Sequence, residues 1–312
     1  MWKYVLKRLG YILVTLWVIV TCTFFMMKNL PGTPFDAERF SIMTPQQQER
    51  VLEMYGLNDS LPMQYVKYIK NMLKGDLGTS FTYVNQDVSK VITGRLGPSA
   101  LIGIQAVLIG LAIGLILGIL AAWKHNSGID YFTMILAVLG VSVPNFVAAA
   151  LLQYYIGLKW GVLPVGFWTG WNCSVLPSIA LSFSATAMVA RFMRTEMLDV
   201  LDQDYIVTAR AKGLSQMKVL MRHAVRNSIL PVVTILGPIV VNLMTGSLAV
   251  ENIFSIPGIG SLFVDCIKAN DYPVIMGITI FYAAFYMLIV LLVDLAYSLI
   301  DPRIRLAKGK ES

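Results

Sequence analysis

Few residues in this chain are of the types that catalyse reactions or hold metals. There are two histidines, His125 and His223, and three cysteines, Cys22, Cys173 and Cys266. The sequence contains no H-E-x-x-H, no cysteine pair at zinc spacing, no G-x-S-x-G and no phosphate-binding G-x-x-x-x-G-K-[ST]. Metalloprotease, serine hydrolase and P-loop ATPase chemistry therefore lack their usual residues. If ATP drives this protein, another polypeptide must bind it, and we expect no cofactor or metal in this chain.

The composition indicates a membrane protein. Of the 312 residues, 56% are hydrophobic and 14% are charged, and the mean hydropathy is +0.67. The net charge of +7 could suggest nucleic-acid binding, but the basic residues lie next to apolar runs rather than in a separate basic domain. We therefore expect these residues to orient the chain in a bilayer, and we expect no nucleic-acid partner.

Six apolar stretches reach or approach the roughly 20 residues that cross ~30 Å of hydrocarbon as a helix. The first is not followed by a small-residue cleavage site, so we expect it to be retained rather than removed as a signal. The fourth is rich in Ser and Ala, which predicts a buried helix in close contact with its neighbours. The predicted spans are residues 9–27, 101–123, 131–156, 175–193, 229–250 and 274–300.

The distribution of Lys and Arg predicts the orientation of these spans. With the N-terminus in the cytoplasm, 15 of the 25 Lys and Arg lie in cytoplasmic segments, whereas the short outer loops hold only Lys159 and Lys268. We therefore expect both termini to be cytoplasmic. The predicted parts are a cytoplasmic start with the first span (1–27), an extracytoplasmic domain (28–100), a core of five spans (101–300) and a cytoplasmic tail (301–312).

The extracytoplasmic domain is predicted to be small and helical. Its sequence favours helices at Thr44–Tyr55 and Met63–Leu73, followed by a turn at Gly75–Gly78. This domain could receive a partner or simply cap the helical bundle.

A disulfide between Cys173 and Cys266 is allowed, because both lie in predicted outer loops, but the sequence does not indicate that they meet.

Residues 191–228 form a basic cytoplasmic loop with seven Lys and Arg between two apolar runs. Gly213 allows a sharp turn between predicted helices at 204–212 and 215–227, and Ser215 suits the N-cap of the second helix. The residues alone fit docking on a cytoplasmic partner and binding to anionic lipid about equally. A stripe of apolar and small residues at helical spacing could make either contact: Ile206, Ala209, Gly213, Met217, Leu220 and Ala224.

Polar and bend-forming positions inside the spans allow an alternative function. Ion-coupled transporters bury ionisable residues near the bilayer midplane, but Asp294 lies near the inner end of the sixth span. A contact with the interface or another helix is the simpler explanation for Asp294, although an ion-coupled secondary transporter or channel stays open.

Pro144, Pro231 and Pro238 are candidate hinges.

Several short segments occur in a fixed order along nearly the whole chain. They are residues 2–34 (WKYVLKRLGYILVTLWVIVTCTFFMMKNLPGTP), 55–57 (YGL), 75–81 (GDLGTSF), 141–146 (VSVPNF), 163–164 (LP), 204–214 (DYIVTARAKGL), 226–227 (RN), 230–231 (LP), 250–260 (VENIFSIPGIG) and 301–303 (DPR). Their order and spacing resemble the membrane subunits of binding-protein-dependent ABC importers, and among them the B subunits of dipeptide and oligopeptide permeases.

This resemblance implies an all-α fold, with six transmembrane helices in the MetI-like permease fold of type I ABC importers and an extracytoplasmic insertion after helix 1. It also implies that the basic loop holds the family's EAA motif, whose coupling helix enters a cleft of the ATP-binding subunit. Val207 stands at the motif's usual acidic position and Pro231 lies farther from the glycine than in the general pattern, so the motif's usual glutamate contact is not expected. The coupling residues implied are Asp204, Ala209, Arg210, Lys212, Gly213 and Leu214.

The resemblance further implies a non-catalytic permease in the bacterial cytoplasmic membrane that imports peptides by alternating access. Its expected partners are a homologous second permease, two ATP-binding subunits that hold ATP and Mg²⁺, an extracytoplasmic peptide-binding protein and membrane lipid. Nickel, glutathione and a peptide pheromone are the alternative cargoes within the same family.

Overall fold

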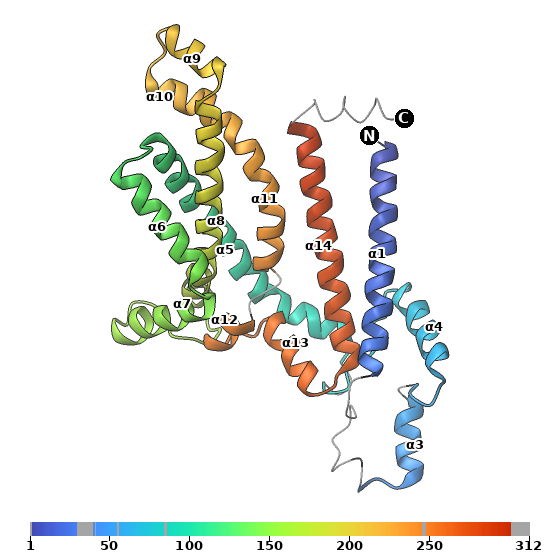
Figure 1. Ribbon diagram of the computed structural model, residues 1–312. Coiled ribbons are helices and arrows are strands. Elements are labelled where there is room, and N and C mark those ends of the chain that lie inside the picture. The colour runs from blue at the N-terminus through green and yellow to red at the C-terminus, as the bar shows by residue number, and fades with distance from the viewer. Residues whose placement is uncertain are drawn as a thin grey trace. The chain divides into compact units, whose positions relative to one another are not determined.

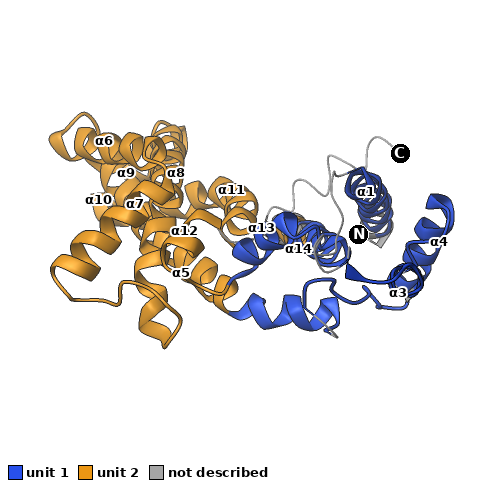
Figure 2. Ribbon diagram, turned by 90° about the horizontal axis from the view of Figure 1, so that it is seen from below, with its two compact units in different colours: residues 1–97, 258–287 blue, residues 98–257, 288–312 orange. Residues whose placement is uncertain are grey.

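The computed structural model describes residues 2–29, 40, 42–54, 56–83, 86–244 and 248–300, and every element named within them is a helix (Figure 1). The predicted tail 301–312, residues 30–39 and Tyr55 lie outside the described residues. The chain divides into two compact units, residues 1–97 with 258–287 and residues 98–257 with 288–312 (Figure 2). The prediction of an all-α fold is confirmed.

The first unit begins with α1 and contains two short helices that follow it in the sequence. Both helices predicted in the extracytoplasmic domain are present, and Pro62 lies in the first turn of the second one, where a missing N–H costs nothing. The helices are α1 (Trp2–Lys28), α3 (Pro45–Met54), α4 (Leu61–Met72), the start of α5 (Val88–Trp123), α13 (Ile259–Lys268) and the start of α14 (Tyr272–Ile300). A hydrophobic core that includes Val88, Ile259 and Ile275 joins the starts of α5, α13 and α14.

Polar contacts hold the segment around Ser80 to the start of α14 and hold α4 to α1. The buried Asp271 carboxylate accepts hydrogen bonds from the Ser80 hydroxyl at 2.5 Å and the Thr82 N–H at 3.0 Å. In the same unit, the Thr21 and Tyr65 hydroxyls lie 2.8 Å apart and join α1 to α4. Burial raises the pKa of the neighbouring Tyr68 above its usual range.

The second unit is arranged around α8, which is the most deeply buried of the candidate spans. Glycines allow this close packing: a Cβ added to Gly114 would lie 2.7 Å from Val189 Cβ, and one added to Gly118 would lie 2.6 Å from the Ala190 carbonyl oxygen. The prediction of a buried fourth span is therefore confirmed. Besides α5, the helices are α6 (Gly128–Ser142), α7 (Asn145–Leu152), a π-helical turn (Gln153–Lys159), a 3₁₀ turn (Trp171–Ser174), α8 (Val175–Leu201), α9 (Asp204–Ala211), α10 (Gln216–Lys218), a second π-helical turn (Val219–Val225), α11 (Arg226–Met244) and α12 (Leu248–Ile253).

The third predicted span is not one straight helix. In the described residues, five helices are long and apolar enough to cross a membrane, and a sixth span results if α6 and the helix from Asn145 to Lys159 are counted together. These two helices are bent by 101° at Val143 and Pro144. Proline forces the preceding residue out of the helical region, and Val143 has φ −82° and ψ 118°. The stretch predicted as the third span, residues 131–156, is therefore a bent pair of helices rather than one straight helix.

The second predicted span begins within a longer helix. The sequence predicts a start near residue 101, but α5 starts at Val88 and continues through Pro98.

The three cysteines are free. Burial raises the pKa of the Cys266 thiol to about 12, so it stays protonated near neutral pH.

Candidate coupling site

The basic loop is a helix-turn-helix at the end of α8 (Figure 1). Only Asp202 and Gln203 separate α8 from α9. The predicted turn is present, since Gly213 has φ +77°, a conformation that a residue with a Cβ rarely adopts. Ser215 occupies the N-cap of the second arm, as expected, but its side chain makes no capping hydrogen bond. We call residues 202–227 the coupling loop.

A small core holds the two arms of the coupling loop on α8. Ile206 and Ala209 of the first arm pack with Val219 of the second arm, and Val200 and Leu201 of α8 pack against them. These contacts join the loop to the last turn of α8. The loop is therefore built to move with that helix rather than separately from it.

Polar contacts add to this attachment. The Asn227 side-chain amide donates a 3.0 Å hydrogen bond to the Tyr205 hydroxyl, which connects the far ends of the two arms. The buried Ser228 hydroxyl donates to the Ala224 carbonyl at 2.9 Å and contacts the Glu196 carbonyl of α8 at 3.2 Å.

Most of the predicted docking stripe faces inward. Ile206 and Ala224 are fully buried, Leu220 is buried, and Ala209 is 6% exposed. Helical spacing of apolar residues identifies a face that avoids water, but it does not distinguish the loop's own core from a partner's surface. Most of the stripe, Ala209 included, therefore packs inside the protein, and Gly213 and Met217 are the members left exposed.

A second apolar surface faces outward instead. Four apolar side chains of the coupling loop are between 36% and 59% exposed. We call them the outer apolar surface: Val207, Leu214, Met217 and Met221. Three of them, at 214, 217 and 221, are separated by three and four positions, which is the sequence signal that could have revealed this second face.

Exposed charges lie on the same loop as the outer apolar surface. Among the predicted coupling residues, Asp204, Arg210, Lys212 and Gly213 are exposed, as is Leu214. Lys218 and Arg222 of the second arm are exposed as well. Exposed apolar side chains together with mainly basic ones suit a protein partner whose contact surface is partly apolar and partly acidic.

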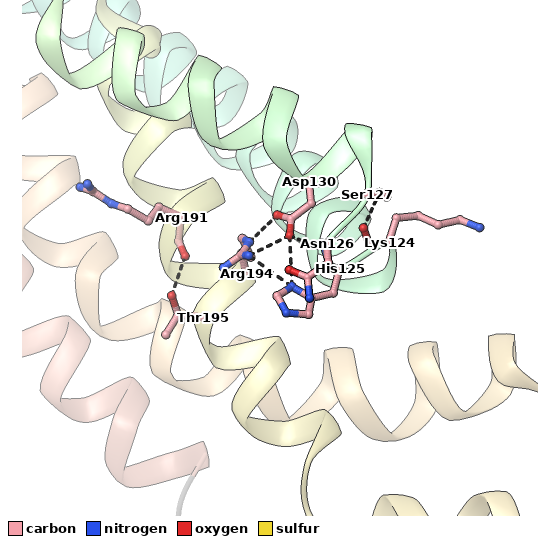
Figure 3. A network of polar contacts seen from close by, with 8 residues as sticks. All are labelled: Lys124, His125, Asn126, Ser127, Asp130, Arg191, Arg194 and Thr195. Carbon is pink, nitrogen blue, oxygen red and sulfur yellow. Dashed lines mark hydrogen bonds and ion pairs between the residues drawn. The ribbon is translucent and has the colours of Figure 1, made fainter.

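The part of α8 that precedes the coupling loop also contacts the turn between α5 and α6 (Figure 3). Arg194 of α8 donates to both carboxylate oxygens of Asp130, at 2.5 and 2.8 Å. The Asn126 N–H donates to Asp130 Oδ2 at 3.0 Å, and His125 Nδ1 lies 3.1 Å from the same oxygen.

The predicted hinge prolines lie in two different settings. Pro144 lies at the bend between α6 and α7, whereas Pro231 and Pro238 lie inside α11, which continues through both.

Among the described residues, no group of three or more His, Cys, Asp or Glu could hold a metal ion.

Comparison of the sequence with known families gives two matches that together cover most of the chain. Residues 114–306 match the family described as "Binding-protein-dependent transport system inner membrane component". Residues 1–98 match the corresponding N-terminal family of the same transport systems.

Individual relatives match nearly end to end. The dipeptide transport system permease protein DppB of Lactococcus lactis is 46% identical over 304 residues, covering 97% of this chain and 99% of the relative. DppB of Bacillus subtilis is 43% identical over 308 residues, covering 98% of this chain and 99% of the relative. The oligopeptide transport system permease protein OppB of Escherichia coli is 38% identical over 307 residues, covering 98% of this chain and the whole relative.

Solved structures show the same fold at much lower identity. An inward-facing structure of the MetNI methionine ABC transporter matches with a TM-score of 0.56 and 13% identity, covering 68% of this chain and 96% of the matched chain. An amino acid ABC transporter matches with a TM-score of 0.51 and 20% identity, covering 69% and 94%. The chain thus belongs to the binding-protein-dependent transport system inner membrane components, within the DppB and OppB family of peptide ABC transporter permeases.

Proposed function

We propose that this chain forms one membrane-spanning half of an ATP-driven importer of dipeptides or oligopeptides. The observation that carries the mechanism is the coupling loop, whose outer apolar surface is exposed while its core is fixed to α8. The names of the relatives support a peptide cargo, and the DppB proteins that are 46% and 43% identical to this chain are dipeptide permeases. Nickel, glutathione or a peptide pheromone are the alternative cargoes.

The proposed partners supply ATP binding, the other half of the pathway and delivery of the peptide. Two ATP-binding subunits would hold ATP and Mg²⁺ and receive the coupling loop, since the chain contains no phosphate-binding loop of its own. A homologous permease would form the other half of the pathway, and an extracytoplasmic binding protein would deliver the peptide. Both termini would lie in the cytoplasm of a bacterial membrane, with lipid around the spans.

Coupling would proceed through α8. Closure of the ATP-binding subunits displaces the coupling loop, and only two residues separate α9 from α8. Because α8 is buried among its neighbours, its displacement shifts the spans together and alternates access to the peptide pathway. Pro144, at the bend between α6 and α7, is a position where such a shift could be absorbed, and Pro231 and Pro238 are further candidates in α11.

The test is peptide uptake into proteoliposomes that contain the whole transporter and its binding protein. Leu214→Asp places a charge on the outer apolar surface, so we expect assembly of the membrane subunits to persist and ATP-driven uptake to fall by roughly tenfold or more. Gly213→Pro should have the same effect, because proline cannot adopt a φ of +77°.

Ser215→Asp is the matched control. It adds the same charge to the neighbouring exposed residue, and aspartate is a good N-cap residue, so uptake should stay close to the wild-type rate. Wild-type uptake by Leu214→Asp would overturn the assignment of the coupling site. Uptake driven by an ion gradient in vesicles without ATPases would favour a secondary transporter instead.

A further inference from the structure

A buried ion pair joins α6 to α8 close to the coupling loop. Asp130 lies in the first turn of α6 and its side chain is 2% exposed, while Arg194 of α8 is 19% exposed. The guanidinium binds the carboxylate through both Nε and Nη2 (Figure 3). This bidentate geometry fixes the direction as well as the distance between the two helices.

The turn between α5 and α6 holds the carboxylate on its other side. The Asn126 N–H and His125 Nδ1 both contact Asp130 Oδ2, and Arg194 Nη2 lies 3.3 Å from His125 Nδ1. The Ser127 hydroxyl also donates to the Lys124 carbonyl within this turn. The Asp130 carboxylate is therefore a fixed point to which the turn and α8 are both attached.

Apolar contacts along the same helices are close but carry no direction of their own. A Cβ added to Gly140 of α6 would lie 2.9 Å from Ala187 Cβ of α8, so the two helices touch with little space between them. The hydrophobic part of this contact is non-directional. The Asp130–Arg194 pair adds a directional contact that resists a shift in register between the two helices.

We propose that the Asp130–Arg194 pair is a positioning clamp that makes α6 follow α8 when the coupling loop moves. This inference rests on the proposed function, since it takes the coupling loop as the point where motion enters. Arg194 lies on the same uninterrupted helix that ends two residues before α9. At its other end, α6 reaches the bend at Pro144, so the clamp would pass the displacement to that bend.

The experiment measures ATP hydrolysis and peptide uptake in the same proteoliposomes of the complete transporter. Asp130→Asn keeps the shape of the side chain but removes its charge, and Arg194→Lys keeps the charge but removes the bidentate contact. For both variants we expect ATP hydrolysis within about twofold of wild type and roughly a tenfold fall in peptide imported per ATP. Asp87→Asn breaks the exposed pair with Lys90 and should leave this ratio unchanged.

A role in stability alone would give a different result. If hydrolysis and uptake fell in parallel with the amount of assembled transporter, or if peptide imported per ATP stayed at the wild-type value, the clamp would be refuted. The exchange of Asp130→Arg together with Arg194→Asp should recover part of the ratio, because it restores the ion pair in reverse.

A spectroscopic readout separates this inference from the proposed function. Dipolar broadening between nitroxide labels at the exposed Lys124 and Thr195 should not change with ATP in the wild-type transporter, but should change with ATP in Asp130→Asn. A change with ATP in the wild type would show that the helices shift against each other and would refute the clamp. Failure of the proposed function would show itself separately, as unchanged uptake in Leu214→Asp.

Discussion

At the residue scale, the coupling loop separates side chains that hold it together from side chains that face outward. Ala209 packs into the internal core, whereas Leu214 and Met217 are exposed. The sequence identified all three as positions of interest, but periodicity could not decide between an internal core and a partner's surface. That decision depends on how α9 folds back on the second arm through Gly213, which is a tertiary property.

The contrast between Ala209 and Met217 is testable. Ala209→Asp places a carboxylate among apolar side chains and should destabilise the folded permease by roughly 2–5 kcal/mol, whereas Met217→Asp replaces an exposed side chain and should cost less than about 0.5 kcal/mol. Thermal unfolding of the purified membrane subunits measures both. Met217→Asp should nevertheless lose co-purification with the ATP-binding subunits. Equal destabilisation by the two substitutions would show that the burial assigned to this loop is incorrect.

At the element scale, the helices were largely predictable and their breaks were not. Apolar stretches of sufficient length located α1, α8 and α14, because crossing a bilayer as a helix satisfies every backbone polar group internally. The sequence marked Pro144 as a hinge, yet hydropathy averaged across it and gave one span where there is a 101° bend. Conversely, the span predicted to begin at residue 101 is part of a longer helix, because α5 starts at Val88 and continues through Pro98.

The glycines of α5 provide a prediction about helix packing. Gly118→Ala would place a Cβ 2.6 Å from the Ala190 carbonyl oxygen, so α5 and α8 must move apart, at a cost of about 1–3 kcal/mol. Gly94→Ala in the same helix meets no atom within 4 Å and should instead stabilise the helix by up to ~1 kcal/mol. Thermal unfolding midpoints in detergent compare the pair. The same shift for both would mean that α5 and α8 do not pack as closely as described.

At the scale of the whole molecule, this permease is a membrane subunit of a peptide ABC transporter, and we propose that it converts motion delivered by other subunits. The family segments along the sequence indicate that role, whereas locating an exposed surface for the partner required the fold. We propose that the outer apolar surface, which includes Met217, makes the contact with an ATP-binding subunit.

Site-specific photocross-linking tests that contact most directly. A photoreactive amino acid in place of Met217, in the complete transporter in native membranes, should give a light-dependent adduct with an ATP-binding subunit. The same amino acid in place of the exposed Trp160, in a predicted outer loop, should give none. An adduct from Met217 confirms the coupling site, whereas adducts with lipid alone, in a transporter shown to be assembled, would contradict it.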